Sequence, residues 1–96
     1  MNRDDIILFL RRYKEKNQNK YGIISIGVFG SAARRAMTEQ SDIDIVVELE
    51  DADMFNLIGI KQDLEEELHR SIDIIRYREK MNAFLKRKIE EEAIYV

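Results

Sequence analysis

The chain has 96 residues, with 16 Lys and Arg against 19 Asp and Glu, one His and no Cys, Pro or Trp, which predicts a single small domain over residues 1–96. The absence of Cys excludes disulfide scaffolds, thiolate metal sites and thiol catalysis, and a single His makes a Ser-His-Asp triad hard to build. The formal net charge of −3 argues against an extended nucleic-acid surface, and no apolar run approaches the ~20 residues that span a bilayer, so we expect a soluble cytoplasmic protein.

Apolar periodicity predicts helices and strands that alternate along the chain. The predicted elements are, in chain order, a helix over 3–16, a turn over 17–22, a strand over 23–29, one or two helical turns over 32–37, a polar loop over 38–41, a strand over 42–50, a helix over 53–69, a strand over 71–77, a helix over 80–92 and a β-prone tail over 93–96. Such alternation is typical of an α/β or α+β domain with a small mixed β-sheet flanked by helices, and the long connections allow parallel strand pairs.

Each predicted helix has an apolar stripe that we expect in the core. The stripes are Ile6, Leu10 and Tyr13 in the first helix, Leu57, Ile60, Leu64 and Leu68 in the second, and Met81, Phe84, Leu85 and Ile89 in the third. Gly59 costs about 1 kcal/mol relative to Ala inside a helix, which predicts a late start or a kink there. The charged runs 65–67, 86–88 and 90–92 are expected to be solvated faces, with contact to a charged partner as the alternative.

The strand over 42–50 carries two carboxylates, which a strand disfavours. Asp42 and Asp44 stand two residues apart, so their side chains share one face with Cα atoms roughly 6.6 Å apart. Like charges that close repel one another unless a cation lies between them. Carboxylate oxygens suit Mg²⁺ or Mn²⁺. A solvated strand edge would explain Asp42 alone, but it explains the pair less well.

A third carboxylate, Asp73, interrupts the otherwise apolar run 72–75. If its strand lies beside the strand that carries Asp42 and Asp44, three carboxylates converge. Such a group can hold two metal ions ~3.5–4 Å apart for phosphoryl transfer.

Gly30 and Ser31 end the preceding strand, with ten residues between Ser31 and Asp42. A glycine N–H and a serine hydroxyl can hold a phosphate oxygen, and a helix that begins at residue 32 would point its free N–H groups at the same anion. A plain N-cap role for Ser31 is the alternative.

The segment GSAARRAMTEQSDIDIVV resembles the signature of the minimal nucleotidyltransferases, a branch of the DNA polymerase β-like nucleotidyltransferase superfamily. The matching positions are Gly30, Ser31, Arg34, Ser41, Asp42, Ile43, Asp44 and Ile45. Asp73 stands where the family places its third acid, and the closing RKIEEEAIYV is also typical. The chain departs from the family at Arg35, where Gly is common, so a flexible turn residue is replaced by a charged one.

The resemblance implies a metal-dependent nucleotidyltransferase that moves AMP from ATP to a hydroxyl and releases pyrophosphate. It implies three catalytic acids that also bind two Mg²⁺ ions, with Mn²⁺ as a substitute: Asp42, Asp44 and Asp73. Asp73 is also the candidate general base. The triphosphate would be bound by Gly30, Ser31 and Arg34.

Small stand-alone members of this family resemble antitoxins. The resemblance therefore implies a hetero-oligomer with a HEPN ribonuclease toxin, with a toxin tyrosine as the acceptor of AMP. An antitoxin that acts by direct binding without catalysis is the alternative. A small-molecule nucleotidyltransferase is a third hypothesis, but another subunit would have to supply its acceptor pocket.

Overall fold

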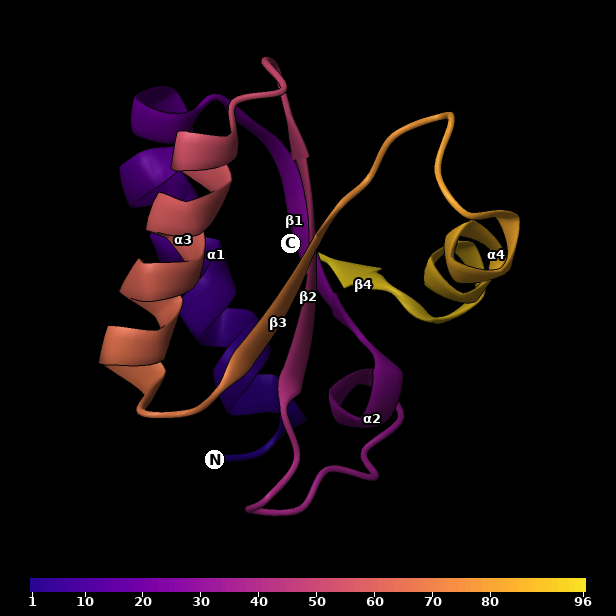
Figure 1. Ribbon diagram of the computed structural model, residues 1–96. Coiled ribbons are helices and arrows are strands. Elements are labelled where there is room, and N and C mark those ends of the chain that lie inside the picture. The colour runs from indigo at the N-terminus through magenta and orange to yellow at the C-terminus, as the bar shows by residue number, and fades with distance from the viewer.

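A four-stranded sheet with helices on both faces forms the protein, as described for all 96 residues by a computed structural model (Figure 1). The elements are α1 (Arg3–Tyr21), β1 (Ile23–Phe29), α2 (Gly30–Ala33), β2 (Ile43–Leu49), α3 (Met54–Leu68), β3 (Ile72–Arg76), α4 (Ala83–Glu92) and β4 (Ile94–Tyr95). In Figure 1, α1 and α3 cover one face of the sheet, whereas α2 and α4 lie on the other. The predicted mixed sheet flanked by helices is confirmed.

The strand order is β3-β2-β1-β4, with β1 antiparallel to both β2 and β4. β2 and β3 are parallel, as the long connection through α3 allows. Their register sets Asp44 directly opposite Asp73. The parallel pair therefore brings together two of the carboxylates that the sequence singled out.

The two faces of the sheet carry cores of unequal size. Alternate residues of β2, among them Ile43 and Ile45, join a 17-residue buried cluster under α1 and α3. On the other face, Phe29, Val46 and Ile89 form a separate cluster of three buried residues. Burial of each large aliphatic side chain contributes about 1.5–3 kcal/mol, so most of the folding free energy comes from the α1/α3 face.

Helix α1 runs through Tyr21, whereas a turn was predicted over 17–22. Residues 17–21 include no Gly or Pro, and the helix ends only at Gly22, whose φ of 66° provides a left-handed C-cap. At Gly59 the helix neither starts late nor is interrupted, since α3 begins at Met54 and runs as one α-helix to Leu68. A Cβ on Gly59 would lie 3.0 Å from the Tyr21 ring, so close packing explains this glycine.

The predicted third stripe is wrong at Phe84, whose side chain is 80% exposed. The helix begins at Ala83, with Asn82 as its N-cap, three residues later than predicted. Of the stripe, only Ile89 is fully buried, because only the later part of α4 rests on the small cluster.

No helix of the chain has the length and apolar character needed to cross a membrane.

Candidate active site

The three predicted acids lie near the start of β2 and β3, at one end of the sheet. Asp44 and Asp73 are paired across the parallel strands, so their side chains leave the same face of the sheet. This face also carries Val46, and it is therefore the one on which α4 lies. Asp42 precedes β2 by one residue. Asp44 is half-buried, while Asp42 and Asp73 are exposed.

Asp44 is the acid whose protonation the fold alters. Burial raises its pKa above the ordinary 3.8, and the negative charge of Asp73 raises it further. The positive charges of Lys88 and Arg34 lower it, and the charge of Asp42 adds to the increase. The net effect is a raised pKa, with burial as its largest cause, so ionised Asp44 is less stable here than a carboxylate in water.

The predicted convergence of three carboxylates is not present as a preformed metal cage. No group of three or more His, Cys, Asp or Glu side chains stands in an arrangement that could hold a metal ion. The strands do bring Asp44 and Asp73 together, and the side chains of Asp42 and Asp73 are exposed. Exposed side chains have rotamer freedom, so nothing locks these two carboxylates away from Asp44.

Gly30 lies in direct contact with Asp44. Its φ is 70°, in the left-handed region that glycine adopts at little cost, and a Cβ there would collide with the Asp44 carboxylate. Gly30 begins α2, which has only four residues, whereas one or two helical turns were predicted over 32–37. The close approach of Gly30 to Asp44 means that an anion held at the Gly30 N–H would lie next to the acids.

The Gly30 N–H and the Arg34 guanidinium already hold an anion, the Glu92 carboxylate. Gly30 N donates to Glu92 Oε2 at 3.3 Å. Arg34 Nη1 donates to Glu92 Oε1 at 2.9 Å and to Oε2 at 3.0 Å. Ser31 is half-buried in α2, between these two donors in sequence. The predicted phosphate-binding residues thus include two that bind a carboxylate of the protein itself.

Sequence reasoning missed Glu92, which was expected to be solvated with the rest of 90–92. Its side chain is only 25% exposed, and it contacts Arg34 across 58 residues of chain. No local pattern signals a contact of that separation. The one available hint is helical spacing, because Lys88 and Glu92 are four residues apart and therefore share a face of α4.

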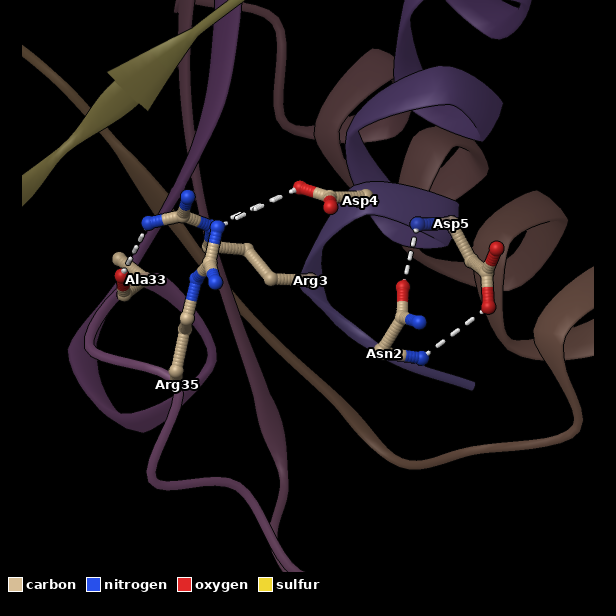
Figure 2. A network of polar contacts seen from close by, with 6 residues as sticks. All are labelled: Asn2, Arg3, Asp4, Asp5, Ala33 and Arg35. Atoms are coloured by element: carbon tan, nitrogen blue, oxygen red, sulfur yellow. Dashed lines mark hydrogen bonds and ion pairs between the residues drawn. The ribbon is translucent and has the colours of Figure 1, made fainter.

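Arg35 has a left-handed backbone, with φ of 60°. Its side chain lies toward the start of α1, with Nη2 at 3.9 Å from Asp4 Oδ1 (Figure 2). The neighbouring Arg3 donates from Nη1 to the Ala33 carbonyl at 3.3 Å. Asn2 caps α1 in the same region. These contacts join α1 to the turn after α2, and the backbone at Arg35 has the conformation that a glycine favours.

A family model, a relative of known sequence and a solved structure all relate this chain to nucleotidyltransferases. Residues 10–96 match the family model described as "Nucleotidyltransferase domain". The chain is 38% identical over 88 residues to "Putative protein adenylyltransferase MJ0126" of Methanocaldococcus jannaschii, covering 91% of this chain and 90% of that protein. A solved structure described as "Structure of putative minimal nucleotidyltransferase" has a TM-score of 0.80 at 27% identity, covering 98% and 95% of the two chains.

One further solved structure bears on the fold. A chain of the complex described as tri-AMPylated Shewanella oneidensis HEPN toxin with MNT antitoxin matches with a TM-score of 0.58 at 21% identity, covering 88% of this chain and 69% of that one. At that identity the likeness establishes a shared fold.

Proposed function

Because this chain belongs to the nucleotidyltransferase domain family, we propose that it acts as an antitoxin that moves AMP from ATP to a tyrosine of a HEPN ribonuclease toxin. Pyrophosphate is the leaving group, and the tyrosine oxygen forms the new bond to the α-phosphorus. One observation carries the proposal: Asp44 stands between Asp73 on the neighbouring strand and the backbone of Gly30. That arrangement sets carboxylates for a metal ion beside donors for a triphosphate.

The acids fit a divalent metal. Their donors are hard carboxylate oxygens, and the pKa of Asp44 is raised first by burial and then by the negative charge of Asp73, a repulsion that a bound cation would offset. In this proposal Asp44 and Asp73, joined by Asp42, hold Mg²⁺. When bound, Mg²⁺ supplies neutralisation of phosphate charge and activation of the acceptor hydroxyl.

The chain's own groups then have distinct tasks. The Gly30 N–H, the Ser31 hydroxyl and Arg34 bind the phosphates of ATP, and their contacts strengthen as charge develops on the departing pyrophosphate. Asp73 lies on β3, which is an edge strand, and its side chain is exposed. An acceptor hydroxyl from another protein can therefore approach Asp73, which accepts its proton.

The test is transfer of label from ATP to the toxin. The protein is incubated with α-³²P-labelled ATP, Mg²⁺ and a candidate HEPN toxin, and the assay is repeated with the Asp42→Asn/Asp44→Asn variant. We expect labelled toxin from the wild type and at least a hundredfold less from the double variant, since loss of charge-stabilising groups costs about that much. Asp51→Asn is the control, because Asp51 is exposed and follows the end of β2 opposite to these acids.

A second candidate function is inhibition by direct binding. Met54, Phe55 and Phe84 are between 70% and 84% exposed, and large exposed apolar side chains favour a protein partner. In that case the toxin is inhibited equally by the wild type and by the double variant, and no label is transferred. That outcome would refute the catalytic proposal.

A further inference from the structure

The anion that holds the Gly30 and Arg34 donors is part of this chain. Glu92 is the last residue of α4, and both of its carboxylate oxygens are hydrogen-bonded, Oε1 to Arg34 and Oε2 to Arg34 and the Gly30 N–H. Like a phosphate, this carboxylate presents anionic oxygens to the guanidinium, and both oxygens accept from Arg34 Nη1. Glu92 therefore satisfies the donors that the proposed function assigns to the triphosphate.

Helix α4 also carries a positive charge that acts on the acids. Lys88 lies one turn before Glu92 and acts on Asp44 with its positive charge. The same helix thus presents a cation toward the carboxylates and an anion toward the phosphate donors. Both members of the Arg34–Glu92 pair belong to this one site, which argues against a chance ion pair on the surface.

We propose that the Glu92 carboxylate occupies, in the nucleotide-free protein, the position of a phosphate group, so that ATP must displace it on binding and pyrophosphate release allows it to return. This inference rests on the proposed function, because it assigns the displaced ligand to the nucleotide. The Gly30 N–H and Arg34 Nη1 donate to Glu92, so a phosphate oxygen can take their hydrogen bonds only where the Glu92 carboxylate withdraws. Glu92 therefore lowers the apparent affinity of the site for every ligand that carries a phosphate chain.

Displacement requires rotation of one side chain only. The backbone on either side of Glu92 is fixed, because Ala93 N donates to Ile89 O at 2.8 Å and β4 begins at Ile94, paired with β1. A glutamate side chain has three rotatable bonds, so its carboxylate can turn toward solvent while α4 stays in place. Nucleotide binding and pyrophosphate release can therefore proceed without movement of the helix.

The experiment measures Kd by isothermal titration calorimetry on the full chain. Mg²⁺ with AMP-PNP and Mg²⁺ with pyrophosphate are titrated into the wild type, Glu92→Gln and Glu91→Gln. Removal of a partly exposed charged competitor should lower both Kd values about fivefold in Glu92→Gln. Glu91→Gln, the same change on an exposed neighbour, should stay within about twofold of the wild type.

Three outcomes decide the matter. A lower Kd for Glu92→Gln with an unchanged Glu91→Gln supports the proposal. An unchanged or higher Kd for Glu92→Gln overturns it, since a Glu92 that only orients Arg34 would help phosphate binding. If no variant binds nucleotide at all, the proposed function fails, and this inference with it. A crystal structure with AMP-PNP gives an independent reading: Arg34 should contact phosphate with Glu92 turned away, and an intact Arg34–Glu92 pair would contradict the displacement.

Discussion

Substitution of Gly30 by Ala tests the contact that joins the acids to the phosphate donors. At φ of 70° a Cβ costs roughly 1–2 kcal/mol, and the added atom would also collide with the Asp44 carboxylate, which must move. For a domain of this size each kcal/mol lowers Tm by about 4–8 °C. We therefore expect a Tm lower by roughly 4–16 °C, together with loss of most nucleotidyl transfer, because the displaced acid is the one nearest the donors.

Gly22→Ala is the matched control for that experiment. Its φ of 66° imposes the same backbone strain, but the nearest atom to an added Cβ is Glu50 Cβ at 3.5 Å, an ordinary contact. This variant should lose stability to a similar extent and retain transfer to toxin. Calorimetry and the labelled-ATP assay on both variants separate strain from chemistry. Equal transfer by Gly30→Ala and Gly22→Ala would refute the assignment of Gly30 and Asp44 to one site.

Two further substitutions probe the same region. Arg35→Gly should raise Tm by a few degrees, because it relieves a left-handed φ of 60° and gives up only an exposed ion pair at 3.9 Å; a lower Tm in a thermal melt would contradict this. Asp44→Asn should raise stability at pH 7, since burial and neighbouring acids raise the pKa of Asp44 in the folded state, and ionising it there costs folding free energy. This cost in folding free energy grows as the pH rises from the ordinary pKa of 3.8 through the raised pKa of the folded state. In urea titrations, the stability gained by Asp44→Asn should therefore vanish below about pH 4. A gain that persists there would exclude the charge of Asp44 as its cause.

The strands were the part of the fold most open to prediction, whereas their order and pairing were left open. The alternation of apolar and acidic residues fixed the two faces of β2, because a strand has a period of two. The boundaries of helices were harder, since they depend on caps. The C-cap at Gly22 and the N-cap at Asn82 both moved a helix end from its predicted position.

The residues of the candidate site were likewise only partly predictable from the sequence. Asp44 and Asp73 were identifiable because a carboxylate inside an apolar strand is unusual, and their register confirms that they are neighbours. The role of Glu92 could not be read from its surroundings in sequence, where it belongs to a run of three glutamates. Its contact with Gly30 spans 62 residues and arises only when α4 packs on the sheet.

The unequal cores have a consequence for how rigid the site is. The strands that carry the acids pack on their other face into the large cluster, while α4 contributes Ile89 to a cluster with only two other buried residues, Phe29 and Val46. Local opening costs least where buried apolar contact is sparse. We therefore expect the strands that carry the acids to be rigid, and local opening of α4 to begin at its N-terminal end, away from the Glu92 end that β4 fixes, without unfolding of the domain.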